Sequence, residues 1–119
     1  MSRYMTALQT TTKIKQDNIA ELVTRIKAIA SGYPSTYAWR DKVLQADSLT
    51  KIADIFEVEL HYIKEDVIPL LHDTYKSQLF TDLLPHIAPL FENGIIAGVV
   101  DNEPFTITFD NGKAVYKEV

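Results

Sequence analysis

The stretch "SLTKIADIFEVELHYIKEDVIPLL", Ser48–Leu71, decides the fold because it fits two structures that imply different functions. On one interpretation it is a helix-turn-helix over residues 48–69, with Ala53 at the small-residue position of the first helix and Ile63 buried in the recognition helix. On the other, a helix over Ser48–Phe56 leads into two β-strands. Only the first interpretation predicts a winged-helix DNA-binding transcriptional regulator.

The local sequence favours the second interpretation. The tight turn of a helix-turn-helix usually contains glycine, because positive φ is costly for a residue with a Cβ, and Glu57 would occupy that position here. A recognition helix over residues 59–68 would bring three acids and one lysine into a groove walled by phosphates. Pro69 would also end it. We therefore expect nucleic-acid binding to be absent.

The same residues have the pattern of a β-hairpin. Residues 58–62 alternate between apolar and polar side chains, which is the period of a strand with one wet face. Lys64-Glu65-Asp66 is predicted to turn the chain, and "VIPLLH" to return as a partner strand. Proline lacks the N–H that a sheet needs, so Pro69 is predicted to confine this strand to an edge or a bulge.

Length and composition indicate one globular domain over residues 1–119. The chain is 46% hydrophobic and 24% charged, as in ordinary globular proteins. It contains no cysteine, which excludes disulfides, thiolate catalysis and zinc ribbons. No run of signal-peptide length begins the sequence, and the longest uncharged apolar run, Gly94–Val100, is too short to span a bilayer. We expect a cytoplasmic protein with no membrane contact.

The N-terminal half is predicted to contain a strand and a helix. Ser2–Gln16 is rich in β-branched residues and predicts a long or bent strand. A helix then begins at Asp17 or Asn18 and ends at Gly32. The following "YPSTYAWRDKVLQAD" is predicted to be a loop or short strand in which aromatic side chains anchor packing, namely Tyr33, Tyr37 and Trp39. A base-stacking platform is the alternative use of these rings.

The C-terminal part predicts a helix and a β-meander. The helix begins at a cap on Thr81 or Asp82, carries Pro85 in or near its first turn, and ends at Asn93-Gly94 after a kink at Pro89. Three β-rich runs follow, and Asn111-Gly112 predicts a tight hairpin between the last two. The fold class is therefore α+β: a mainly antiparallel sheet, made of the N-terminal strand, the central hairpin and the meander, packed against two or three helices.

Several segments resemble a group of small uncharacterised proteins of bacteria and their phages. They are "YMTA", "TKIKQDN", "YAW", "VLQADSLTKIADIFEVE", "IAPLFENG" and "FTITFDNGK". The resemblance covers most of the chain and implies an α+β fold with a helix followed by a β-meander, but no activity. One feature departs from it. Those proteins have a Trp-rich strand before the last turn, where this chain has Phe105, Ile107 and Phe109.

Charge is unevenly distributed. The net charge is −4, yet residues 1–46 carry seven Lys/Arg against three acids, whereas residues 47–119 carry five against thirteen. Acids gather around residues 47–73, and the candidate protein-binding residues are Asp54, Glu57, Glu59, Glu65 and Asp66. A solvated surface is the simpler interpretation. The functional hypothesis is a non-catalytic interaction protein, possibly encoded by a phage or prophage, that binds a basic host protein through this acidic surface.

No catalytic or cofactor motif is present in the sequence, so we do not expect an enzyme. His61 and His72 would lie on neighbouring strands of the hairpin, where Glu59 or Asp73 could join them as metal ligands. Their spacing matches no dedicated metal motif, and surface histidines are the simpler interpretation. The sequence leaves a homodimer open, because the C-terminal strand has no obvious protection against edge pairing.

Overall fold

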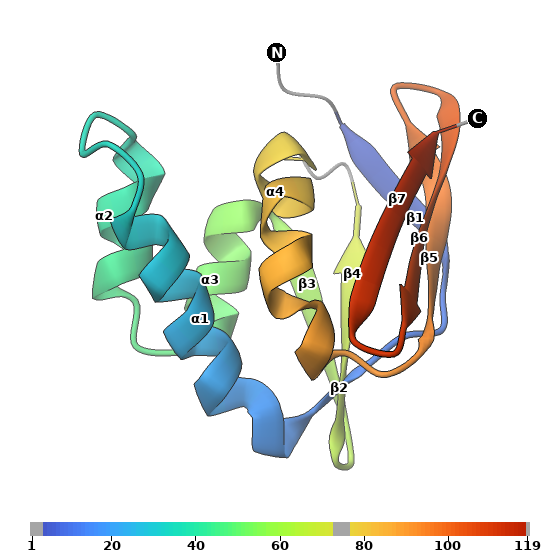
Figure 1. The fold of residues 1–119 in the computed structure, drawn as a ribbon, viewed down its shortest axis with the longest axis horizontal. Helices are drawn as coiled ribbons and strands as arrows, with labels where there is room; N and C mark the ends of the chain where they lie inside the picture. The colour runs from blue at the N-terminus through green and yellow to red at the C-terminus, as the bar shows by residue number, and fades with distance from the viewer. Residues whose placement is uncertain (1–3, 73–76, 119) are drawn as a thin grey trace.

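The computed structural model describes residues 4–72 and 77–118, and these residues form an α+β fold with two antiparallel sheets. A four-stranded sheet lies on one side of the molecule and the helices α1, α2 and α3 gather on the other, with α4 between them (Figure 1). The predicted fold class is confirmed. The hairpin, however, belongs to a second sheet, and the described residues form four α-helices where two or three were predicted.

The four-stranded sheet contains the predicted meander. Its order is β1-β5-β6-β7, and its strands are β1 (Met5–Thr10), β5 (Gly94–Val100), β6 (Glu103–Asp110) and β7 (Lys113–Glu118). Asn111 and Gly112 turn the chain between β6 and β7 with φ of 51° and 78°, as predicted. Asp101 and Asn102 also form a tight two-residue turn, between β5 and β6, with positive φ at both positions.

The three-stranded sheet contains the predicted central hairpin. Its order is β2-β4-β3, with β2 (Ile14–Lys15), β3 (Val58–Ile63) and β4 (Asp66–Leu71). Lys64 and Glu65 alone form the hairpin turn, and Asp66 already pairs with Ile63. The helix-turn-helix interpretation is therefore wrong, because the residues of its recognition helix are extended.

The expectation that Glu57 would avoid positive φ is wrong. Glu57 has φ of 62° and ψ of 36°, so this non-glycine residue does adopt the left-handed conformation. It ends α3 (Leu49–Phe56), and its N–H donates to the carbonyl oxygens of Ala53 and Asp54. At the other end of α3, the Ser48 hydroxyl accepts a hydrogen bond from the Lys51 N–H at 3.2 Å. The predicted helix is therefore confirmed, with Ser48 as its cap.

Pro69 does not place β4 at an edge, since β4 is the middle strand of its sheet. The Gln16 N–H donates to the Glu65 carbonyl at 2.9 Å, so the backbone groups of Glu65 face β2. Backbone groups alternate sides along a strand, and the nitrogen of Pro69 therefore faces the same side. β2 pairs only with Asp66 and Val67. The missing N–H thus lies beyond the end of β2, where no ladder bond is lost.

The predicted N-terminal strand is divided between the two sheets, and its first residues, 2 and 3, lie outside the described ranges. The break falls between β1 and β2 at residues 11–13, where the buried Thr12 hydroxyl donates to the Glu92 carbonyl at 2.6 Å. Gly94 opens β5 and does not end a helix. A Cβ at Gly94 would lie 2.6 Å from the Thr12 nitrogen, so this crossing of the chain requires glycine.

The first two helices form a pair. After a short 3₁₀ turn, η1 (Gln16–Asn18), α1 (Ile19–Ser31) ends at Gly32 as predicted and buries three apolar side chains, Leu22, Ile26 and Ala30. The segment predicted as a loop or short strand is instead mostly helical and forms α2 (Ala38–Gln45). This helix buries only Val43 fully, so it lacks the apolar period that would have revealed it.

The last helix begins earlier than predicted. α4 (Ser77–Ile87) carries Pro85 near its C-terminal end, not in its first turn. The chain then tightens into η2 (Ala88–Leu90), which contains Pro89. The prediction of a disturbance at Pro89 is confirmed, because the α-helix ends just before it.

Candidate functional site

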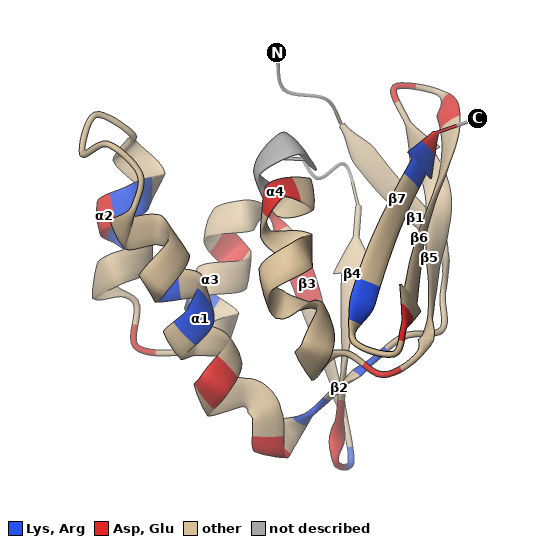
Figure 2. Cartoon of the chain, viewed as in Figure 1, with Lys and Arg blue, Asp and Glu red and all other residues tan. Residues whose placement is uncertain are grey.

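The predicted acidic surface is divided between two places. Asp54 and Glu57 lie at the C-terminal end of α3, and Glu59 follows at the start of β3, whereas Glu65 is in the hairpin turn and Asp66 opens β4. Four strand steps of ~3.3 Å separate Glu59 from Ile63 by roughly 13 Å, and Glu65 lies beyond Ile63 in the turn. Figure 2 shows acidic residues both at the hairpin tip and around α3 and β3. The five residues do not form one surface.

The Asp66 carboxylate forms ion pairs with two lysines of the same chain. Its two carboxylate oxygens accept hydrogen bonds from Lys13 Nζ at 3.0 Å and Lys15 Nζ at 2.9 Å. The hydrogen bonds from Lys15 and Lys13 lower the pKa of Asp66, and the bond to Asp66 raises the pKa of Lys15. Glu92 lies 3.7 Å from both lysines. Two lysines and two carboxylates thus form a neutral cluster that ties β2 to β4, and Asp66 is not an open site for a basic partner.

A groove lies beside the other acids. It has a volume of about 520 Å³ and is bounded by residues of α2 and of the end of α3, namely Ala38, Trp39, Lys42, Asp54, Ile55 and Glu57. Trp39 and Ile55 are half-buried, whereas Lys42, Asp54 and Glu57 are exposed. The groove therefore combines an apolar floor with a rim of two carboxylates and one ammonium group.

The floor of the groove is held in place by aromatic packing. The Trp39 ring lies 4.9 Å from that of Tyr33 in an edge-to-face arrangement and 6.2 Å from that of Phe56, which is buried in α3. Tyr37 lies 6.1 Å from Trp39. Burial, followed by the charge of Asp82, raises the pKa of Tyr33. The predicted role of these aromatics as packing anchors agrees with this arrangement, and Trp39 also presents part of its ring to the groove.

His61 and His72, the histidines suggested as metal ligands, do not lie close together. No group of three His, Cys, Asp or Glu residues in the described ranges is arranged to hold a metal ion. His61 Nε2 lies 3.3 Å from the Glu59 carboxylate on the same face of β3. His61 pairs with Ile68, so His72 is four residues further along the neighbouring strand, or roughly 13 Å away. Asp73, the other suggested ligand, lies outside the described residues.

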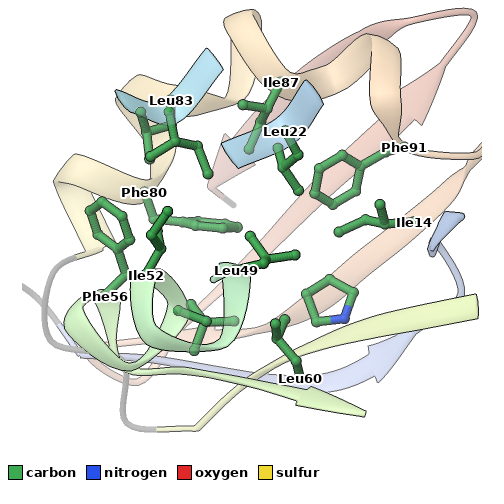
Figure 3. Close-up of a pocket in the computed structure, with 14 residues that line it drawn as sticks. Ile14, Leu22, Leu49, Ile52, Phe56, Leu60, Phe80, Leu83, Ile87 and Phe91 are labelled. Carbon is green, nitrogen blue, oxygen red and sulfur yellow. The ribbon is translucent and has the colours of Figure 1, made fainter. Parts of the chain in front are cut away.

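A second cavity is lined by apolar side chains. It has a volume of about 50 Å³ and lies where α1, α3 and α4 meet the three-stranded sheet. The side chains labelled in Figure 3 converge on it, among them Leu49, Leu60 and Phe80. All fourteen lining residues are apolar. Because this lining offers no polar group to a ligand, we interpret the cavity as a packing defect of the core.

The acids of the groove could be predicted from the sequence, whereas its basic and apolar residues could not. Asp54 and Glu57 were candidates, whereas Lys42 and Ile55 were not, and Trp39 was assigned only to packing or base stacking. These residues were missed because the helix α2 was not predicted. A helix over residues 38–45 places Trp39 and Lys42, three residues apart, on one face.

No protein-family model, curated protein or solved structure matches the chain. The predicted resemblance to small bacterial and phage proteins therefore stays a prediction. No helix among the described residues has the length and apolar character needed to cross a bilayer.

Proposed function

We propose that the protein is a non-catalytic binding protein that takes an arginine-rich segment of a basic protein partner into the groove between α2 and α3. The observation that supports this is the position of Trp39 next to the carboxylates of Asp54 and Glu57 along one groove. A guanidinium group stacks on an indole face and pairs with a carboxylate through two parallel hydrogen bonds. The groove offers both features to one side chain.

The charges around the groove support a cationic ligand. Asp54 makes no side-chain hydrogen bond or ion pair with the residues that the structure describes, so its carboxylate faces solvent. Lys42 is the one basic residue among the six that line the groove. Glu59 extends the negative charge onto β3. The other acids of the original hypothesis, Glu65 and Asp66, are not part of the proposed site, since they lie at the far end of the hairpin.

The proposal can be tested through Trp39, which is the single tryptophan of the chain. The probe is an octapeptide of alternating arginine and glycine, and the signal is Trp39 fluorescence. We expect saturable quenching that weakens as salt rises, because the exposed charges are screened. A peptide with glutamine in place of arginine is expected to leave the fluorescence unchanged.

Two charge reversals separate a specific groove from general electrostatics. Asp54→Lys changes the rim of the groove, and Glu65→Lys makes the same change in net charge in the hairpin turn, outside the groove. An exposed ion pair contributes up to about 1 kcal/mol, or about fivefold in affinity, and reversal adds repulsion. We expect Asp54→Lys to weaken binding at least fivefold and Glu65→Lys less than twofold. Equal losses in the two variants would refute the proposal, as would a lack of fluorescence change.

A further inference from the structure

β3 has an open edge. In the order β2-β4-β3, only β4 pairs with it among the described residues. Among the other outer strands, β2 bridges to Phe91 through Ile14, β1 contacts β4, and β7 contacts α4 and η2, whereas β3 contacts α3. The edge of β3 is therefore the place where a further strand can be added to this sheet.

The alternation of the backbone shows which groups face outward. Glu65 faces β2, so Asp66, Ile68 and Leu70 face β3. Their partners on β3 are Ile63, His61 and Glu59, whose backbone groups face β4 in turn. The N–H and C=O groups of the three remaining residues, Val58, Leu60 and Tyr62, point to the open edge. In residues 4–72 and 77–118, no backbone hydrogen bond outside the strands uses them.

β3 also lacks two of the features that protect edge strands, proline and a β-bulge. It contains no proline, and its register with β4 runs through all six residues without a bulge. Tyr62 and Ile63 are 48% and 51% exposed. By contrast, β1 is interrupted by a register shift between Ala7 and Gln9. An unprotected edge with exposed apolar side chains favours strand addition.

We infer that β3 pairs with β3 of a second copy of this chain, antiparallel and around a two-fold axis at Leu60. In this register Leu60 faces Leu60 of the second copy and Val58 faces Tyr62, so the outward backbone groups form hydrogen-bonded pairs. Glu59 of each copy faces His61 of the other. These two pairs occupy the non-hydrogen-bonded positions of the ladder, where facing side chains lie closer together. Each copy thus presents a carboxylate acceptor to an imidazole of the other copy, in both directions, which suits an interface between identical surfaces.

The neighbouring registers are less favourable. Moving the axis to His61 places the two imidazoles opposite each other and Glu59 opposite Ile63. Moving it to Tyr62 places Glu59 opposite Glu65, and like charges at directly opposed positions are destabilising. The axis at Leu60 is the one among these three that gives Glu59 an imidazole N–H donor on the facing strand.

The first test removes one outward N–H. Sedimentation velocity between micromolar and millimolar chain concentration is expected to show a reversible monomer–dimer equilibrium. Tyr62→Pro removes an intermolecular donor and keeps every β3–β4 hydrogen bond, whereas Tyr62→Thr removes the same ring but keeps the N–H. Two donors are lost per dimer, so we expect the dimer to be weakened about tenfold or more in Tyr62→Pro relative to Tyr62→Thr. A chain that is monomeric throughout the range overturns the inference.

The second test addresses the register and does not depend on whether the proline variant folds well. Glu59→Lys removes the carboxylate that accepts from the facing imidazole, and His61→Glu places two carboxylates opposite each other, so we expect each to weaken the dimer. Together they restore opposite charges in the proposed register, so the double variant is expected to recover most of the affinity. Failure of the double variant to recover, with unfolding temperatures of dilute monomers matched, overturns the proposed register.

Discussion

The cavity beneath α3 predicts that one added methylene stabilises the fold. Val58 lines this cavity and is 7% exposed, and Val58→Ile directs one more carbon toward a space of about 50 Å³. A single water molecule needs only about 10–15 Å³ of such space, so the added group fits without displacing its neighbours. Valine and isoleucine have similar strand preferences, which leaves burial as the main difference.

The expected magnitude follows from the buried area. One buried methylene contributes about 0.8 kcal/mol. For a chain of this size, about 1 kcal/mol changes the unfolding temperature by roughly 3–5 °C. We therefore expect Val58→Ile to raise the midpoint of thermal unfolding by about 3 °C, as measured by calorimetry, and to raise the free energy of unfolding in urea without a change in slope.

The matched control is Val67→Ile on β4. Val67 is 0% exposed and does not line the cavity. The same extra carbon has no space there, so we expect a loss of about 1–3 kcal/mol from overpacking. If both variants lose stability equally, the space beneath α3 does not exist in solution and the reasoning from it is refuted.

Three further predictions concern single positions. Gly98→Ala is expected to destabilise the four-stranded sheet by at least about 1–3 kcal/mol in urea unfolding, because its Cβ would lie 2.0 Å from the Thr6 carbonyl oxygen; unchanged stability would contradict that close approach. Lys64 has φ of 54° in the hairpin turn, so Lys64→Gly is expected to stabilise by about 0.5–1 kcal/mol, whereas Glu65→Gly, without positive φ, is expected to destabilise. The pKa of Asp66 is lowered in the folded state, so its contribution to stability is present above the pKa of the unfolded chain and is lost as pH falls through the folded pKa. Asp66→Asn is expected to flatten this acid limb of the unfolding temperature, and an unchanged pH profile would show that the Lys13–Asp66–Lys15 cluster is not maintained.

The hairpin could be predicted from sequence because its signal is local. The alternation over residues 58–62 and the capping serine of α3 both act within a few residues, and the structure contains the strand and the cap. The hairpin prediction is correct even though Glu57 adopts the positive φ that was counted against a helix-turn-helix. A left-handed residue at a helix end costs little when its N–H satisfies the last carbonyls, as it does for Ala53 and Asp54.

The features that could not be predicted depend on partners distant in sequence. The N-terminal strand breaks where Thr12 bonds to Glu92, 80 residues away. Asp66 is neutralised by lysines 51 and 53 residues before it, so counting local charge overestimated the acidic surface. Pro69 is tolerated in a middle strand because β2 stops at two residues. Each outcome depends on tertiary pairing that no local pattern encodes.

The groove and the open edge of β3 are related by geometry. Two antiparallel strands in one sheet have their two-fold axis perpendicular to that sheet, so α3 lies on the same face in both copies. The two grooves of a β3-paired dimer would then open on one face, and a ligand with two arginine-rich segments would engage both. Such a ligand gains up to about 10²–10⁴ in avidity when its linker spans the two sites. We expect Tyr62→Pro to reduce binding of a two-segment peptide and to leave the single octapeptide unaffected in the Trp39 assay. An equal loss for both peptides would mean that the strand variant damages the groove itself, because a single segment has no use for a second copy.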